Sequence, residues 1–264
     1  MMRALWSAAS GMKAEQDNMD VVANNIANVN TTGGKKVRAE FQDLMYQNLR
    51  AAGATSGPNS RYPTGLAIGL GTKTSATQRI FTQGNLQSSG NPTDVAIQGE
   101  GFFRIEMPDG TTAYTRDGSF KLDENRRLVT TDGYPLADGI TIDESAPLDS
   151  IVIGSDGQVS CKPAGSDQMQ TVGQITISRF VNPAGLTAIG KNLFQVSDAS
   201  GDAIDSTPGQ DGAGTLSQGV LEMSNVQIVE EMVNMIIAQR AYESNSKAIT
   251  TSDSMLEIAN GLKR

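Results

Sequence analysis

The sequence predicts an α+β protein in which a helix at each end of the chain flanks an antiparallel, all-β domain in the middle. Three observations lead to this fold class. Apolar residues recur in steps of seven near both termini, a Gly- and Pro-containing stretch follows the first row, and short β-type segments alternate with turns in between. A strict step of seven is typical of a helix that buries a narrow seam against another helix. We therefore expect the two terminal helices to form one discontinuous coiled-coil domain.

The first helix is predicted over residues 3–30. The pair Gly33-Gly34 marks its exit, because glycine readily adopts the left-handed conformation that ends a helix. Two apolar rows run along it at the same step of seven. The predicted seam is the row Leu5, Met12, Met19 and Ile26. The second row is interrupted by Glu15 and consists of Ala8, Val22 and Val29.

The second helix is predicted over residues 225–262, after a capping box formed by Ser224 and Gln227. At 1.5 Å per residue the two helices would be about 42 Å and about 57 Å long. A helix with so narrow an apolar seam buries too little surface to be stable alone. We expect the dilute subunit to have disordered termini and a folded β core. The predicted seam of the second helix is Ile228, Met235, Tyr242, Ile249 and Leu256.

Amide side chains crowd the polar faces of both predicted helices. A merely solvated face usually carries more Glu and Lys, so we interpret the amides as a whole as intersubunit contacts. For any single asparagine, a solvated surface position explains it equally well. The residues that we single out in the first helix are Asn24, Asn25 and Asn28.

The stretch between the first helix and the β domain changes character twice. Residues 35–49 fit a short helix through Phe41, Leu44 and Met45, and residues 51–71 fit a long irregular or extended loop. Loops of this length are usually functional or linker-like. The predicted domains are a coiled-coil domain of 1–34 with 220–264, an extended bridging segment of 35–85 and a β-rich domain of 86–219.

The middle of the chain carries the β signal. Short β-type runs begin near residues 94, 101, 113, 150 and 174. Asp-Gly is a preferred pair for tight hairpins because both central residues need positive φ. Six such pairs punctuate the segment, at 109–110, 117–118, 132–133, 138–139, 156–157 and 211–212.

Composition disfavours most catalytic and binding classes. The chain has 21 Lys and Arg against 29 Asp and Glu, a net charge of −8, which argues against nucleic acid and anionic membranes as partners. It has no histidine and only Cys161, so the usual general base, a disulfide and a thiolate metal cluster are missing. No stretch reaches the roughly 18–20 apolar residues of a membrane span. We expect no enzyme activity, cofactor, metal site or membrane insertion.

The apparent catalytic motifs fail on inspection. Residues 65–74 resemble a phosphate-binding loop, but no glycine directly precedes Lys73. Ser244 and Lys247 match Ser-x-x-Lys but lie deep in the second helix without a Lys-Thr-Gly partner. The acidic turns leave open one rival from another class, a secreted β-rich protein that binds or hydrolyses carbohydrate. The missing histidine, cleaved signal and disulfides disfavour it.

Three segments carry a resemblance to a known family. Asp-Val-Val-Ala-Asn-Asn-Ile-Ala-Asn-Val-Asn-Thr-Thr-Gly at 20–33 closely resembles the N-terminal signature of the bacterial flagellar rod and hook family. Residues 224–247 resemble its C-terminal helix, and Ile-Gln-Gly-Glu-Gly-Phe-Phe at 97–103 is similar to a third family segment. One departure is Gly34, where the family usually carries an aromatic residue.

The resemblance implies a subunit that leaves the cell through the flagellar type III export apparatus without a cleaved signal. Such subunits polymerise helically into the axial drive shaft that crosses the periplasm, with the terminal helices as inner tube and the β domain outside. The length and the stretch 46–85 are most similar to distal-rod subunits; hook and proximal-rod subunits are the alternatives. The implied partners are further copies, the proximal rod proteins, the hook protein and the surrounding ring bushing.

Overall fold

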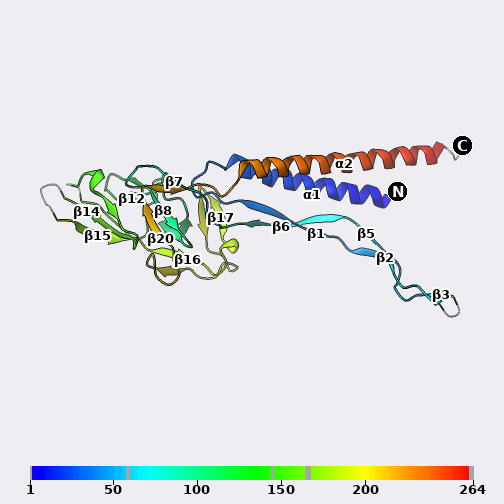
Figure 1. The fold of residues 1–264 in the computed structure, drawn as a ribbon, viewed down its shortest axis with the longest axis horizontal. Helices are drawn as coiled ribbons and strands as arrows, with labels where there is room; N and C mark the ends of the chain where they lie inside the picture. Colours follow the sequence, from blue (N-terminus) through cyan, green and yellow to red (C-terminus); the bar gives the residue numbers. More distant parts are fainter. Residues whose placement is uncertain (1, 58–59, 144–145, 164–167, 262–264) are drawn as a thin grey trace. The chain divides into compact units, whose positions relative to one another are not determined.

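The computed structural model describes residues 2–57, 60–143, 146–163 and 168–261. The chain forms two compact units. The first, called the helical unit, comprises Met1–Ile26, Val37–Gln78 and Gln227–Arg264, and the second, called the β unit, comprises Ala27–Lys36 and Arg79–Val226. Two helices and many antiparallel strands make this a mixed α+β protein, which confirms the predicted class (Figure 1).

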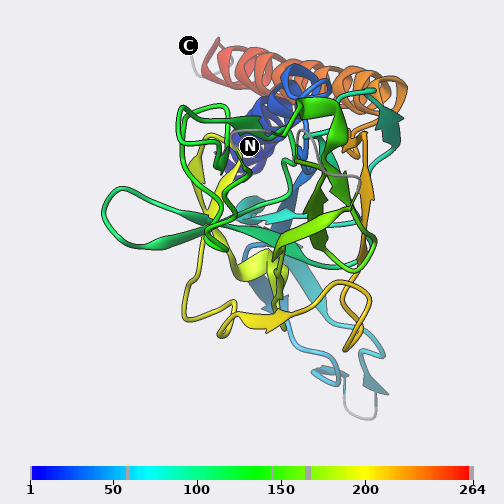
Figure 2. The same ribbon diagram turned by 90° about the vertical axis from the view of Figure 1, so that its left-hand side faces the viewer.

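The two helices of the helical unit are α1, Met2–Ala27, and α2, Ile228–Gly261. They lie side by side in both views (Figures 1 and 2). The predicted end of the second helix at Leu262 lies outside the described residues. The first helix ends earlier than predicted, and Gly33 with its positive φ of 65° lies in the turn that follows.

The start of α2 also differs from the predicted capping box. The Glu231 amide donates to the Gln227 carbonyl at 3.1 Å, so the first helical hydrogen bond involves Gln227. The Ser224 hydroxyl instead accepts from the Val226 amide at 3.3 Å. The predicted cap residue therefore shapes the turn before the helix.

The rest of the helical unit is a set of paired strands. β1 (Val37–Asp43) pairs with β6 (Thr72–Arg79), β2 (Tyr46–Arg50) pairs antiparallel with β5 (Leu66–Gly69), and the short β3 (Thr55–Gly57) pairs with β4 (Ser60–Arg61). The helix predicted within 35–49 was wrong. Its backbone pairs with strands far along the chain, and the apolar residues behind the prediction do not form one buried face, since Phe41 and Met45 are exposed.

The β unit contains fifteen described strands, β7 to β21. A six-stranded sheet has the order β17-β18-β10-β9-β16-β19, and a three-stranded sheet has the order β13-β14-β15. The remaining strands pair as β11-β12, β20-β8 and β21-β7. The strands are Leu86–Ser88, Val95–Gln98, Phe102–Glu106, Thr112–Thr115, Lys121–Leu122, Leu128–Val129, Val152–Ile153, Gln158–Cys161, Gln170–Gln174, Ile177–Arg179, Thr187–Gly190, Leu193–Gln195, Ile204–Ser206, Thr215–Gln218 and Val220–Glu222.

Both faces of the six-stranded sheet are covered. Side chains alternate along β9, so that Phe103 and Ile105 enter the main apolar core while Phe102 enters a smaller aromatic cluster. That cluster contains edge-to-face pairs such as Tyr114 with Phe180, 4.9 Å between ring centroids. Aromatic pairs of this kind contribute roughly 0.5–1.5 kcal/mol beyond their buried area.

Five of the six Asp-Gly pairs lie in turns, the exception being the pair at 117–118, and only some of the five close a hairpin between named strands. The pairs at 109–110 and 156–157 connect β9 to β10 and β13 to β14. Only Asp211-Gly212 has positive φ at both residues, 50° and 74°. The hairpin between β17 and β18 instead uses Lys191-Asn192, with φ of 54° and 60°, so a two-residue turn with positive φ values forms here without glycine.

Candidate assembly surfaces

The two terminal helices run antiparallel with a constant register. The side chain of Asn25 meets Glu231 through a 3.0 Å hydrogen bond. Two heptads away on both helices, Gly11 faces Asn245, where a Cβ on Gly11 would lie 2.8 Å from Asn245 Nδ2. From the first contact to the second, the residue number falls by 14 in α1 and rises by 14 in α2, so the helices are antiparallel.

The structure places the predicted seam residues at different depths. Leu5, Met12, Met19, Ile26, Met235, Ile249 and Leu256 are half-buried. Ile228 and Tyr242 are 46% and 39% exposed. The buried positions in the two helices are Ala8, Ala14, Val22, Asn25, Glu231 and Ala238.

Sequence reasoning missed a second row in α2. Glu231 and Ala238 are buried, and Asn245 and Ser252 are half-buried at the same step of seven. Their side chains are polar or small, so a search for large apolar residues passes over them. The signal that would have found them is the second position of the heptad, three or four residues from the predicted row.

The three asparagines singled out in the first predicted helix also differ in burial. Asn25 is buried, and its amide donates to the Val37 carbonyl at 2.8 Å while its side-chain oxygen accepts from the Val37 amide at 2.9 Å. Asn24 and Asn28 have exposed side chains. The Asn28 side-chain oxygen accepts a hydrogen bond from the Thr31 hydroxyl at 3.2 Å.

Outside the seam, α2 carries a second set of apolar side chains that are exposed to solvent. They recur at helical spacing in the first half of the helix, with exposed fractions of 49–75%. The members of this exposed α2 patch are Val229, Met232, Val233, Ile236 and Ile237. A helix with apolar residues on all sides is ordinarily buried on all sides. The only tryptophan, Trp6 on α1, is also 72% exposed.

The β1–β6 pair of the helical unit contacts α1. The Thr74 hydroxyl donates to Asp17 Oδ2 at 2.6 Å, and the Thr72 amide donates to the Ser10 hydroxyl at 3.3 Å. Gly71 leaves no room for a side chain against Ser10. Beyond this contact, the ribbon of β2 and β5 exposes Met45, Tyr46, Leu49, Leu66, Ile68 and Leu70.

The charge of the chain is unevenly divided. The helical unit contains ten basic and ten acidic residues, whereas the β unit contains eleven basic and nineteen acidic residues. The whole net charge of −8 therefore belongs to the β unit. The helical unit is neutral, so its surfaces can pack against one another without net repulsion.

A buried ion cluster joins distant segments of the β unit. The Lys35 ammonium lies 2.6 Å from Glu222 Oε1, and both side chains are fully buried. Arg116 Nε lies 3.3 Å from the other Glu222 oxygen with 4% of its side chain exposed. Burial lowers the pKa of Lys35, although the carboxylate of Glu222 opposes this and the charge of Arg116 adds to it. The cluster thus holds two cations around one carboxylate.

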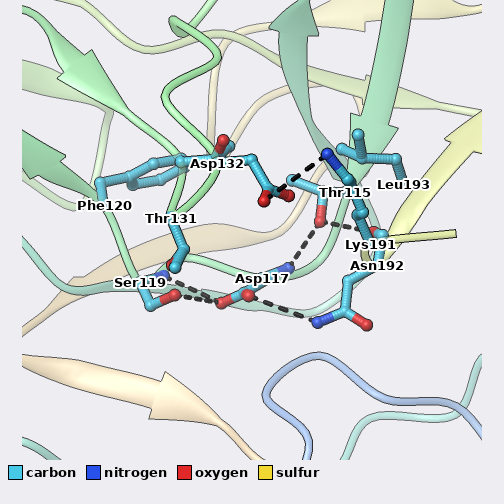
Figure 3. A pocket seen from close by; sticks show the side chains of 10 residues that line it. Thr115, Asp117, Ser119, Phe120, Thr131, Asp132, Lys191, Asn192 and Leu193 are labelled. Atoms are coloured by element: carbon cyan, nitrogen blue, oxygen red, sulfur yellow. Dashed lines mark hydrogen bonds and ion pairs between the residues drawn. The ribbon is translucent and has the colours of Figure 1, made fainter.

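A hollow of about 240 Å³ lies beside the β17–β18 hairpin, and Figure 3 shows the side chains that line it. Its two carboxylates are engaged by donors of its own wall. Asp117 accepts from the Ser119 amide and hydroxyl at 3.0 and 2.8 Å, and Asp132 lies 3.6 Å from the Lys191 ammonium. These contacts hold loops in place, and we assign the hollow a structural role.

Among the residues that the structure describes, no group of three or more His, Cys, Asp or Glu side chains is arranged to hold a metal ion. Likewise, no described helix is long and apolar enough to cross a membrane. Cys161 is buried in β14.

Three family models match the chain. They are described as flagella basal body rod protein (residues 5–35), flagellar hook protein FlgE/F/G D1 domain (residues 96–161) and flagellar basal body rod FlgEFG protein C-terminal (residues 217–262). The matched ranges include the first predicted seam, part of the β unit core and the whole of α2.

Curated relatives match over nearly their full length. The flagellar basal-body rod protein FlgG of Borreliella burgdorferi is 59% identical over 264 residues, which is 100% of both chains. FlgG of Buchnera aphidicola subsp. Schizaphis graminum is 50% identical over 97% of this chain and 98% of its own. FlgG of Caulobacter vibrioides is 48% identical over 99% and 100%.

Proposed function

Because the chain belongs to the family of flagellar basal-body rod proteins and is a structural subunit of the distal rod, we propose that copies polymerise helically through their terminal helices. In this proposal α1 and α2 pair as a coiled coil and form the inner wall of a tube. The rod then transmits torque from the motor to the hook.

The exposed α2 patch is the observation that carries this proposal. Its five apolar side chains are 49–75% exposed among the described residues, and burying such side chains contributes about 25 cal/mol per Å² of apolar surface. The neutral charge of the helical unit favours packing between identical copies, while the acidic β unit favours an outward position. The predicted seam residues on both helices belong to this inner wall.

The ribbon of β2 and β5 is proposed to bridge neighbouring subunits. A two-stranded ribbon is at best marginally stable in water, and this one exposes apolar side chains on its surface. Contact with a neighbouring copy would cover them and stiffen the rod. In the assembled rod we retain the division into a coiled-coil domain of 1–34 with 220–264, a bridging segment of 35–85 and a β domain of 86–219.

The remaining partners follow from the place of a distal rod subunit. We propose contacts with the proximal rod proteins, the hook protein and the ring bushing, after passage through the flagellar type III export apparatus into the periplasm. A role in catalysis is not part of the proposal, since the relatives are named flagellar basal-body rod proteins. The rival carbohydrate hydrolase gains no support from the hollow beside β17, whose two carboxylates are engaged by Ser119 and Lys191 of its own wall.

The test is electron microscopy of the purified full-length chain at increasing concentration, with tryptophan emission recorded on the same samples. We expect tubes, together with a shift of Trp6 emission to shorter wavelength as this exposed side chain is covered. A chain that stays monomeric at all concentrations, or that binds and cleaves glycans, would contradict the proposal.

A further inference from the structure

Two asparagines hold the backbone of two consecutive residues, Lys36 and Val37. In the β unit, Asn225 Oδ1 accepts from the Lys36 amide at 2.7 Å. In the helical unit, Asn25 makes two bonds to Val37, one to its amide and one to its carbonyl. Lys36 is the last residue of a segment of the β unit and Val37 the first of a segment of the helical unit.

The side chain of Asn225 also binds a second segment of the β unit. Its Nδ2 donates to the carbonyls of Ile80 and Thr82 at 2.9 and 3.1 Å. The Ile80 amide in turn donates to the Lys36 carbonyl at 2.8 Å. An amide has one acceptor oxygen and two donor hydrogens, and this arrangement uses both kinds.

We call the bonds of Asn225 to Lys36, Ile80 and Thr82 the Asn225 lock, and the bonds of Asn25 to Val37 the Asn25 lock. The Asn225 lock lies beside well-buried contacts of the same segments. The Gly33 amide donates to the Glu222 carbonyl at 2.8 Å, and the Lys35 ammonium binds Glu222 and the Thr82 carbonyl. These bonds lie inside the β unit and do not involve either helix. We therefore expect them to persist in a subunit whose helices are still unfolded.

Asn25 has a different environment. It lies within α1 and its Nδ2 also donates to Glu231 of α2 at 3.0 Å, in a contact buried from solvent. Its bond to Glu231 requires both helices to be folded and paired, and its two bonds to Val37 require α1 to be folded. The Asn225 lock and the Asn25 lock thus belong to different stages if the helices fold only on assembly.

We propose that Asn25 and Asn225 are positioning residues for assembly: Asn225 fixes Lys36 in the free subunit, and Asn25 fixes Val37 when the helices pair. Residues 27–36 follow α1 and residues 222–226 precede α2, so the first lock keeps the two helix ends together before the helices form. Holding them together reduces the entropy lost when the helices pair. The inference rests on the proposed function.

The test uses full-length protein and hydrogen exchange, by NMR on the dilute monomer and by mass spectrometry on tubes. In wild-type monomer we expect the amides of Lys36 and Ile80 to be protected and the amide of Val37 to exchange freely. In tubes the peptide containing Val37 becomes protected. Asn225→Asp keeps the acceptor but loses both donors, so protection at Lys36 and Ile80 should fall at least about tenfold in the monomer.

Asn25→Asp should change assembly and not the monomer. It leaves amide exchange in the monomer unchanged but places a carboxylate against Glu231, so the protein concentration at which tubes form should rise at least about tenfold. Asn30→Asp, the same chemical change at an exposed position of the exit segment, is the control and should alter neither readout.

Free exchange of Lys36 and Ile80 in wild-type monomer would overturn the inference whether or not tubes form, and so would normal assembly of Asn25→Asp. Failure of the wild-type chain to form tubes would instead contradict the proposed function. If Asn225→Asp unfolds the β unit, Asn225→Ala, which adds no charge, decides in its place: unchanged protection at Ile80 would overturn the inference.

Discussion

Glu222→Gln should destabilise the β unit more than Lys35→Met, because the buried cluster holds two cations and one carboxylate. Removing the carboxylate charge leaves Lys35 and Arg116 buried without an opposite charge, with side chains 0% and 4% exposed. Losing one partner of a buried pair costs about 3–5 kcal/mol. That is a large part of the roughly 5–15 kcal/mol that stabilises a typical domain.

Lys35→Met leaves a neutral pair of Arg116 and Glu222, and the Gly84 amide still donates to Glu222 at 2.9 Å. The main cost is then the loss of the charged hydrogen bond to Glu222, about 1.5–3 kcal/mol, since the Thr82 carbonyl that Lys35 also contacts still accepts from Asn225 Nδ2 at 3.1 Å. Urea unfolding followed by far-ultraviolet circular dichroism measures both variants. A Lys35→Met cost equal to or above that of Glu222→Gln would refute the charge reasoning.

The same cluster predicts how stability depends on pH. Burial places the folded pKa of Lys35 below its ordinary value of 10.5. Between the two values the unfolded chain binds more protons than the folded chain, so the free energy of unfolding should rise with pH up to about 10.5. Glu222→Gln removes the carboxylate that holds the pKa of Lys35 up, so the rise in unfolding free energy with pH should become larger. Lys35→Met removes the titrating group and should abolish its contribution to the rise. Unfolding titrations in the alkaline range test the sign.

The remaining predictions concern glycines that face a neighbour. Gly33→Ala should cost several kcal/mol in β unit stability, because a Cβ there would lie 2.7 Å from a backbone nitrogen at positive φ. Gly110→Ala, with positive φ but open space, should cost only about 1–2 kcal/mol; equal losses by denaturation would contradict this. Gly11→Leu should raise the concentration needed for tubes by tenfold or more, since it overpacks against Asn245. Ala9→Leu, at an exposed position, should not, and a matching rise there would remove the argument for register.

Local patterns were sufficient for the helices and for many strands. The step of seven located both helices within a few residues, and runs such as the one at residues 101–105 became strands, because these signals depend on side chains close in sequence. The family was likewise recognisable from the signature at 20–33. The seam was only partly predictable: the row of large apolar residues was visible, but Glu231 and Ala238 were not.

The elements that sequence reasoning missed depend on distant partners. The spacing of Phe41 and Leu44 suggested a helix. Residues 37–43 instead form β1, because they pair with β6, about 30 residues further along the chain. The Lys35–Glu222 pair joins residues 187 positions apart. The bonds from Asn225 to Lys36 and Ile80 also cross most of the chain. No local pattern announces a buried charge or amide whose partner is far away.

Limited trypsin digestion of the dilute and the assembled chain, with fragments identified by mass spectrometry, tests most directly whether the terminal helices fold only with partners. In the dilute subunit we expect rapid cleavage at Lys13 in α1 and at Arg240 and Lys247 in α2, while the buried Lys35 stays intact. In tubes all four sites should resist. Intact Lys13 and Arg240 in dilute monomer would show that the helices are stable alone and would contradict the account.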